Sequence, residues 1–188
     1  SDMDSFRNCR QIVLDEIEQS LGMIDPEEVN AFVSVVLDAK RVFFTGVGRV
    51  LLSLKAMAKR FYHLGIDVHI VGDITEPAAT PDDILIVGSG SGESKVPLTI
   101  AKIAYEKGAR IIHIGSNRSS SLAPLTYLMV RIPVQTKLYL EDEIQSRQVM
   151  SSLFEQSLLL FGDIVALMIV QRRNLDLKEL WRFHANLE

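Results

Sequence analysis

The sequence predicts an α/β fold in which a mostly parallel, doubly wound sheet carries helices on both faces. Three observations lead to this prediction. Short apolar runs rich in β-branched residues alternate about five times with segments whose apolar residues recur at helical spacing. Glycine-rich turns follow two of these runs, at residues 46–49 and 88–94, and each turn opens a helical segment. Such alternation is typical of right-handed βαβ units, whose ligands bind at the carboxyl ends of the strands.

Composition favours one globular domain spanning residues 1–188, with residues 1–2 as an expression scar. The chain is 47% hydrophobic and 23% charged, which is enough apolar material for a sizeable core. Its net charge is -4 and it has no cluster of lysine and arginine, which argues against a nucleic-acid surface. The single cysteine, Cys9, excludes an intramolecular disulfide and suits the cytoplasm, and its helical spacing from Phe6 and Val13 predicts a core position.

Two helices are expected before the first strand. Apolar residues at helical spacing predict an amphipathic helix over residues 3–21, ended by Gly22. Asp25 then supplies an N-cap, Pro26 the first helical position and Glu28 a capping-box acid, so a second helix should run to about Ala39.

The remaining elements follow in order. Strands are expected at residues 41–45, 66–71, 84–87, 110–115 and 127–132. Helices are expected from 49 to Gly65, from 95 to Gly108 and briefly at 122–126. After a polar stretch at 135–147, a long helix from about 148 to 172 has an apolar pattern too broad for one buried stripe. Part of it should pack against another subunit, and its apolar tract is too short for a membrane span.

The loop at residues 88–94 is predicted to bind an anion. It joins a buried strand to the N-terminus of a helix, where backbone N–H groups and the helix dipole favour negative charge. Gly90 and its neighbouring glycines let the backbone approach a ligand, while Ser89, Ser91 and Ser94 each offer a hydroxyl to phosphate oxygens. A flexible βα turn without a ligand is the simpler alternative.

Glu155 and His184 are candidates for acid or base chemistry. Glu155 lies at the start of an apolar helix, where apolar neighbours would destabilise the ionised carboxylate and suit it to proton transfer at neutral pH. The alternative is an acid that simply favours the helix N-terminus. For His184, near the chain end, the alternative is a solvated surface histidine.

Other polar residues have weaker functional interpretations. Arg49, after Gly48 in the first glycine loop, could meet a ligand phosphate or hydroxyl, or lie on a helix surface. Glu93 and Glu76 could contact a sugar or merely belong to a helical turn and a proline turn. The remaining histidines show no metal-ligand spacing, so no metal site is predicted; they are His63, His69 and His113. The dinucleotide-binding motif is incomplete, because Leu51 stands in place of its third glycine or alanine. The nucleophile-elbow and P-loop motifs are absent, which argues against hydrolases and NTPases.

The chain resembles the sugar isomerase (SIS) domain family, and within it the 6-phospho-3-hexuloisomerases. The motifs that carry the resemblance are residues 88–94, 152–156 and 182–188, with further likeness at 42–49, 63–65 and 71–77. The resemblance implies a flavodoxin-like, three-layer fold with a five-stranded sheet, a homodimer or homotetramer, and a site shared between subunits. It also implies conversion of D-arabino-hex-3-ulose 6-phosphate to fructose 6-phosphate without cofactor or metal.

Site roles follow from the same resemblance. Ser89, Ser91 and Ser94 would bind the phosphate, Glu155 would move a proton between C2 and C3, and His184 would assist polarisation or ring opening. Val50 stands where the family usually has a serine after the glycine-arginine pair. Two alternatives stay open: another SIS-type aldose-ketose isomerase, and a phosphosugar-binding sensor without chemistry.

Overall fold

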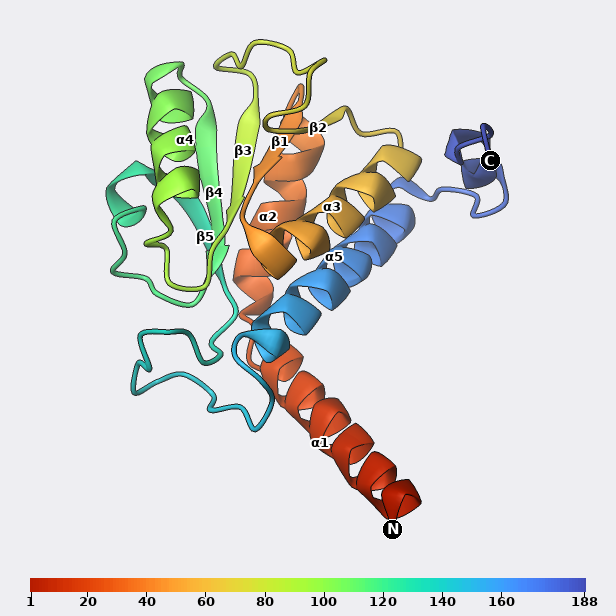
Figure 1. The fold of residues 1–188 in the computed structure, drawn as a ribbon. Coiled ribbons are helices and arrows are strands. Elements are labelled where there is room, and N and C mark those ends of the chain that lie inside the picture. Colours follow the sequence, from red (N-terminus) through yellow and green to blue (C-terminus); the bar gives the residue numbers. More distant parts are fainter.

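The computed structural model describes residues 1–188 and contains one five-stranded sheet. The strands are β1 (Val42–Thr45), β2 (Val68–Ile70), β3 (Ile84–Gly88), β4 (Arg110–Gly115) and β5 (Thr126–Arg131). They lie in the order β2-β1-β3-β4-β5, and every neighbouring pair is parallel. The predicted α/β fold is therefore confirmed (Figure 1).

Helices cover both faces of this sheet (Figure 1). One face carries α2 (Pro26–Asp38), α3 (Gly48–His63) and α5 (Ser152–Arg173), and the other carries α4 (Lys95–Glu106) with the short 3-10 helix η1 (Ala123–Leu125). Side chains alternate along each strand, so Phe44 joins the larger core under α3 and α5, whereas Phe43 joins the smaller core under α4. A parallel sheet with helices on both faces buries both sides of its strands, so continuous apolar runs are expected in them.

The strand order places a topological switch point between β1 and β3. From β1 the chain crosses to β2 on one side, and from β3 it continues to β4 and β5 on the other. Loops that leave the carboxyl ends of β1 and β3 therefore diverge and leave a crevice between them. The two glycine-rich loops singled out from the sequence are the ones that follow these strands.

The start of α2 confirms part of the predicted capping. Asp25 is the N-cap and accepts a hydrogen bond from the N–H of Glu27 at 2.9 Å, and Pro26 is the first helical residue. Glu28 does not close a capping box. Its carboxylate accepts instead from the N–H of Arg131 at 3.0 Å and from Arg118 at 2.8 Å, because α2 packs beside β5.

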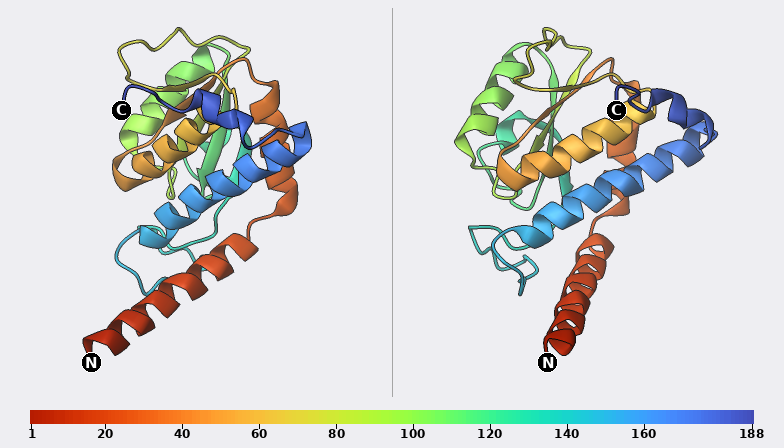
Figure 2. Two further views of the ribbon diagram at one scale, coloured as in Figure 1. Left: turned by 90° about the vertical axis from the view of Figure 1, so that its right-hand side faces the viewer. Right: turned by 45° about the vertical axis from the view of Figure 1, so that its right-hand side comes forward.

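The first helix, α1 (Asp2–Gly22), extends away from the body of the molecule (Figures 1 and 2). Its last turns pack on α5, where the hydroxyls of Ser20 and Ser157 are hydrogen-bonded in the interior. Residues 1–11 are all exposed, including Phe6 at 66%. The predicted core position of Cys9 is wrong, because helical spacing identifies an apolar stripe but not how much of it the same chain covers.

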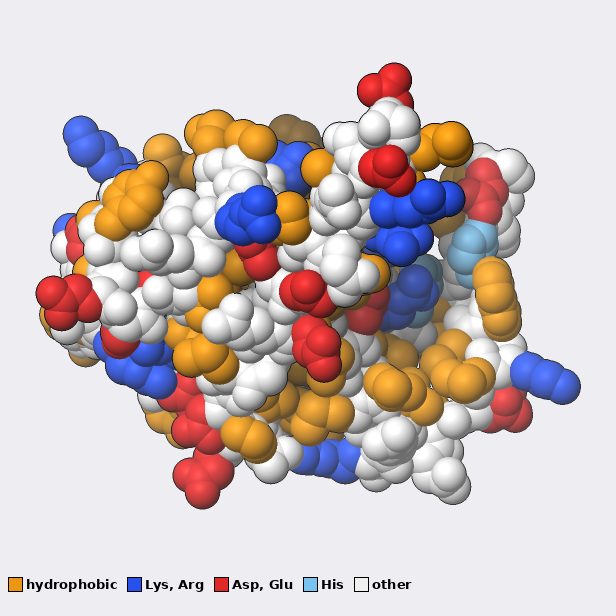
Figure 3. All heavy atoms as spheres, turned by 90° about the horizontal axis from the view of Figure 1, so that it is seen from below, with side chains coloured by type: hydrophobic (Ala, Val, Ile, Leu, Met, Phe, Trp, Pro, Cys, Tyr) orange, Lys and Arg blue, Asp and Glu red, His pale blue; other side chains and the backbone are white.

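Hydrophobic side chains are spread between charged ones on the face from which α1 extends (Figure 3). Exposed apolar residues of α1 and α5 include Met3, Leu14, Ile164 and Leu167. Their exposure leaves apolar surface on both helices uncovered within one chain.

Helix α5 begins at Ser152, four residues later than the sequence pattern predicts. By length and composition it could cross a membrane, but 56% of its most apolar stretch is buried inside the molecule. It packs against α1, α2 and α3, as a core helix does. Its first turn lies beside the start of α3, which brings Glu155 toward the crevice at the switch point.

Candidate active site

A pocket of about 270 Å³ occupies this crevice at the carboxyl ends of β1 and β3. The structure brings seven of the eight site residues predicted from the sequence into its lining: Gly48, Arg49, Ser89, Gly90, Ser91, Ser94 and Glu155. They come from the loop after β1, the loop after β3 and the first turn of α5. Three segments distant in sequence thus meet at one small polar cavity.

The hydroxyls of the loop after β3 are arranged as hydrogen-bond donors. Ser89 Oγ accepts the N–H of Gly92 at 2.9 Å, and Ser91 Oγ accepts the N–H of Glu93 at 3.1 Å. A hydroxyl that accepts a hydrogen bond keeps its own proton free to donate. Ser94 is the N-cap of α4 but makes no capping hydrogen bond with its side chain, so its hydroxyl is also uncommitted.

The carbonyl groups of the same loop face away from the pocket, toward β4 and the turn after it. The carbonyl of Ser89 accepts from His113 Nε2 at 2.8 Å, that of Gly90 from the N–H of Ser116 at 2.9 Å, and that of Ser91 from the side chain of Asn117 at 3.1 Å. Since the acceptors are occupied on one side, the loop presents donors on the other. This arrangement suits an anion at the N-terminus of α4.

His113 is buried beneath this loop, as the sequence allowed for a core histidine. Burial lowers the pKa of its imidazole from the ordinary 6.5, and the hydrogen bond to the Ser89 carbonyl opposes this in part. Because a carbonyl can only accept, Nε2 carries the proton. The neutral ring therefore supports the loop from below.

The loop after β1 supplies Arg49 through a left-handed glycine. Gly48 has a φ of +56°, a conformation that costs little only for glycine, and it begins α3, separated from the end of β1 by two residues. The helix lies so close to β3 that a Cβ at Gly88 would stand 2.7 Å from Leu54 Cδ1. Val50, the residue after Arg49 in α3, also lines the pocket.

Glu155 is buried, and polar groups hold its carboxylate. Arg49 donates from Nε to one carboxylate oxygen, and Ser151 donates from Oγ to the other at 2.6 Å. Ser53 on α3 donates to the backbone carbonyl of Glu155 at 2.8 Å, which ties the first turn of α5 to α3. The predicted apolar surroundings are therefore wrong in part, because both carboxylate partners stabilise the ionised form.

His184 does not reach this pocket within one chain. It follows the short 3-10 helix η2 (Glu179–Phe183) and stacks on His63, the last residue of α3, with ring centroids 6.1 Å apart. Arg49 is the second residue of α3, and at about 1.5 Å per residue roughly 20 Å of helix separate it from His63. Glu155, which pairs with Arg49, and His184, which stacks on His63, thus lie near opposite ends of α3.

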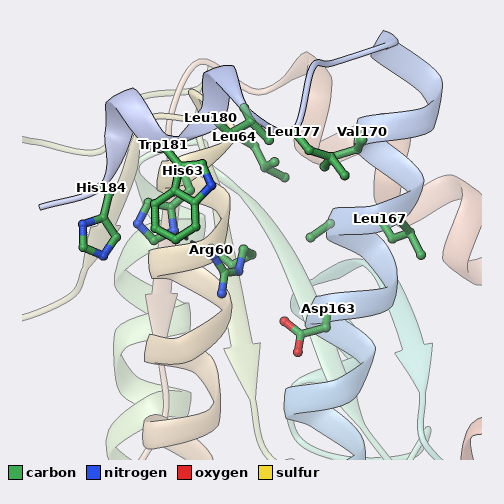
Figure 4. A pocket seen from close by; sticks show the side chains of 11 residues that line it. Arg60, His63, Leu64, Asp163, Leu167, Val170, Leu177, Leu180, Trp181 and His184 are labelled. Atoms are coloured by element: carbon green, nitrogen blue, oxygen red, sulfur yellow. Dashed lines mark hydrogen bonds between the residues drawn. The ribbon is translucent and has the colours of Figure 1, made fainter.

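The cavity beside His184 is larger, about 600 Å³, and lies between α3, α5 and η2 (Figure 4). Trp181 and His63 lie next to His184 on one side, and Asp163 faces them from α5. Seven of its eleven lining residues are hydrophobic. The smaller pocket is the better candidate site, because it alone combines the switch point, an anion-binding loop and a buried carboxylate.

The other polar candidates have structural partners. Glu93 accepts hydrogen bonds from the N–H and the hydroxyl of Ser121, both at 2.7 Å, and so joins the loop after β3 to the turn after β4. Glu76 accepts the N–H of Gly72 at 2.7 Å within its own turn. No group of three or more histidine, cysteine, aspartate or glutamate side chains is arranged to hold a metal ion.

Sequence reasoning missed one wall of the pocket. An irregular segment between β5 and α5 contributes four residues to the lining: Gln135, Thr136, Lys137 and Ser151. The one signal in the sequence was that residues 135–147 are polar in an otherwise apolar part of the chain.

The model of the SIS domain family matches residues 36–160. A 3-hexulose-6-phosphate isomerase of Mycobacterium gastri is 37% identical over 185 residues, covering 98% of this chain and 92% of that protein. A 3-hexulose-6-phosphate isomerase of Bacillus subtilis is 35% identical over 176 residues, covering 94% and 95% of the two chains.

A solved structure from Methanococcus jannaschii has a similar fold. Its TM-score is 0.82 at 31% identity, with 96% of this chain and 99% of that chain covered. Its crystal structure was used to infer a function of 3-hexulose-6-phosphate isomerase. The similarity spans nearly the whole length of each of these proteins.

Proposed function

This chain belongs to the SIS domain family and is a phosphosugar isomerase, and from that premise we propose that it interconverts D-arabino-hex-3-ulose 6-phosphate and fructose 6-phosphate as a single SIS domain. The observation that carries the proposal is the convergence of a serine-rich anion loop and a buried carboxylate in one pocket. Two relatives named 3-hexulose-6-phosphate isomerase, each similar to this chain over nearly its full length, support this choice of substrate.

The phosphate binds at the loop after β3. Ser89, Ser91 and Ser94 donate their hydroxyl protons to its oxygens, and the N-terminus of α4 adds its positive dipole end. With the phosphate fixed there, the carbons to be isomerised extend toward the first turn of α5. The carboxylate of Glu155 is held at that side of the pocket.

Glu155 is the base that moves the proton. In the direction of fructose 6-phosphate, its carboxylate removes the proton from C2, the C3 carbonyl oxygen gains negative charge, and a cis-enediol forms. The proton then returns at C3, while the C2 hydroxyl becomes the carbonyl, so the step needs no redox group. Ser151 and Arg49 fix the carboxylate in place during both transfers.

Arg49 also stabilises the enediolate. Its Nε donates to Glu155, but its Nη groups make no hydrogen bond within the chain, and its side chain, which lines the pocket, is 66% exposed. A guanidinium can therefore hold the base with one N–H and donate others to the oxygens on C2 and C3.

His184 acts in the pocket of a neighbouring subunit. Within one chain it lies at the far end of α3 from Glu155, and exposed apolar side chains on α1 and α5 offer surface for assembly. We expect a cytoplasmic homodimer or homotetramer in which His184 assists polarisation or ring opening in the partner's site.

NMR of fructose 6-phosphate incubated with the protein in deuterated water tests the function. Deuterium at C3, together with a 3-ulose product, is the expected result, because the enediol exchanges its proton with solvent. Glu155→Gln should lower the rate of label uptake at C3 by at least about 1,000-fold while fructose 6-phosphate still binds.

Two other outcomes would contradict the proposal. Label at C1 with an aldose product would show an aldose-ketose isomerase. Saturable binding with neither label nor product would show a phosphosugar sensor.

A further inference from the structure

The segment between β5 and α5 brings Lys137 to the anion-binding side of the pocket. Lys137 lines the same 270 Å³ cavity as Ser89, Ser91 and Ser94. Its backbone is placed by a turn in which the hydroxyl of Thr136 accepts the N–H of Leu138 at 3.1 Å.

Arg49 does not balance the negative charge that a sugar phosphate brings into the pocket. A sugar phosphate carries between one and two negative charges at neutral pH, and Glu155 adds one. Arg49 and Lys137 are the only lysine or arginine residues in the lining, and Arg49 is paired with Glu155. The serine hydroxyls and backbone N–H groups are neutral donors, so a full positive charge beside the phosphate strengthens its binding beyond what these donors give.

A buried carboxylate, that of Glu143, holds this segment against the turn after β4. Glu143 is 7% exposed and accepts hydrogen bonds from the N–H of Leu140 at 2.8 Å, the N–H of Thr136 at 3.3 Å and the hydroxyl of Ser116 at 2.6 Å. Thr136 packs on the loop itself, since a Cβ at Gly90 would lie 3.1 Å from its methyl group. The backbone position of Lys137 is therefore fixed by contacts within the fold.

The ammonium of Lys137 also acts on the loop after β3. The pKa of Glu93 is lowered first by the hydrogen bonds from the hydroxyl and the N–H of Ser121, and to a smaller extent by the charge of Lys137. Glu93 directly precedes Ser94, so this charge lies within electrostatic range of the proposed phosphate position.

We propose that Lys137 binds the phosphate group of the substrate and supplies its counter-charge. The inference rests on the proposed function in taking the ligand to be a sugar phosphate. It adds a residue from a wall of the pocket that the glycine and serine motif does not include. The role is binding, so Lys137 acts on affinity and not on proton transfer.

The test compares Lys137→Met, Lys137→Arg and Lys107→Met in the full-length protein. Lys107 is the matched control, because it is an exposed lysine at the opposite end of α4 from the pocket. The measurements are KM and kcat for fructose 6-phosphate, calorimetric binding of fructose 6-phosphate, and competition by inorganic phosphate, each at low and at 0.3 M salt.

For Lys137→Met we expect KM, Kd and the inhibition constant of inorganic phosphate to rise together by roughly 10- to 100-fold, with kcat within about threefold. Lys137→Arg should stay within about threefold of the parent protein, and Lys107→Met should be unchanged. The parent's affinity should fall with salt more steeply than that of Lys137→Met.

Three results would overturn the inference: unchanged KM and Kd in Lys137→Met, a fall in kcat alone, or an arginine variant as weak as the methionine variant. Failure of the proposed function has a different signature. If the parent protein binds fructose 6-phosphate without turning it over and Lys137→Met weakens that binding, the isomerase reaction is wrong and the role of Lys137 stands. A parent protein that binds neither fructose 6-phosphate nor inorganic phosphate would overturn both.

Discussion

His113 makes the stability of the folded protein depend on pH. Burial lowers its pKa below 6.5, so the folded protein keeps the ring neutral where the unfolded chain already takes up a proton. As the pH falls through 6.5, protons therefore bind preferentially to the unfolded state. The free energy of unfolding decreases from there down to the lower pKa that His113 has in the folded state. The slope from this residue cannot exceed about 1.4 kcal/mol per pH unit.

Replacing His113 with glutamine should remove this part of the slope. The glutamine side chain can still donate to the Ser89 carbonyl, as His113 Nε2 does at 2.8 Å, but it does not titrate. Chemical unfolding between pH 5 and 8 should give a flatter profile for His113→Gln than for the parent. His113→Leu, which leaves the carbonyl without its partner, should be less stable at every pH. Equal slopes in the parent and the glutamine variant would contradict the prediction.

At the same scale, the sequence predicted some pocket residues and missed others for a physical reason. Ser89, Ser91 and Ser94 were found because a strand, a turn and a helix follow one another within a few residues, and each leaves a local pattern. Lys137 left no such pattern, because its place depends on the hydrogen bond between Glu143 and Ser116, which are 27 positions apart. Sequence spacing cannot show a contact of that kind.

At the scale of elements, α1 and the segment before α5 are joined by one buried carboxylate. Glu16 accepts hydrogen bonds from the hydroxyl of Ser146 at 2.6 Å, the N–H of Arg147 at 2.8 Å and the side chain of Gln148 at 3.1 Å. Burial raises the pKa of Glu16, but these bonds outweigh it and the net effect is to lower the pKa. The segment they hold leads directly to Ser151, which binds the Glu155 carboxylate.

Glu16→Gln should therefore weaken catalysis as well as stability. The amide has one acceptor atom and adds a donor where three donors already converge, so about 2–3 kcal/mol of stability should be lost. Because Ser151 is then less well positioned, kcat and the rate of deuterium uptake at C3 should fall roughly 5- to 20-fold, with KM changed less.

Glu18→Gln is the matched control, since Glu18 is an exposed glutamate on the same helix. It should match the parent protein in kcat and in stability. Activity should be measured well below the unfolding temperature, so that all variants are fully folded. A normal kcat for folded Glu16→Gln would show that Glu16 has a structural role alone.

The elements themselves were largely predictable, and their extents were not. Five strands and the helices between them follow from periodicity, because each buries its apolar side against the same sheet. The strand at β2 is three residues shorter than its pattern, and α5 starts late, because hydrogen bonding to neighbouring segments sets these ends. The exposed half of α1 could not be foreseen, since its pattern matches that of a covered helix.

At the scale of the whole molecule, the separation of Glu155 from His184 predicts how activity depends on assembly. The two side chains lie at opposite ends of α3, roughly 20 Å apart along the helix, so one chain cannot bring them together without unfolding its C-terminal segment. If both serve one reaction, each active site takes Glu155 from one subunit and His184 from its neighbour.

Mixing two inactive variants tests this arrangement. Glu155→Gln and His184→Asn should each be nearly inactive alone. In a mixed dimer one site contains both substitutions and the other contains neither, so one intact site forms. Random reassociation of equal amounts makes about half of the dimers mixed, and roughly a quarter of the parent activity should return. The variants must be unfolded and refolded together to exchange subunits, with each refolded alone as a control. If the two side chains act within a single chain, every site in the mixture carries one of the substitutions and no activity returns.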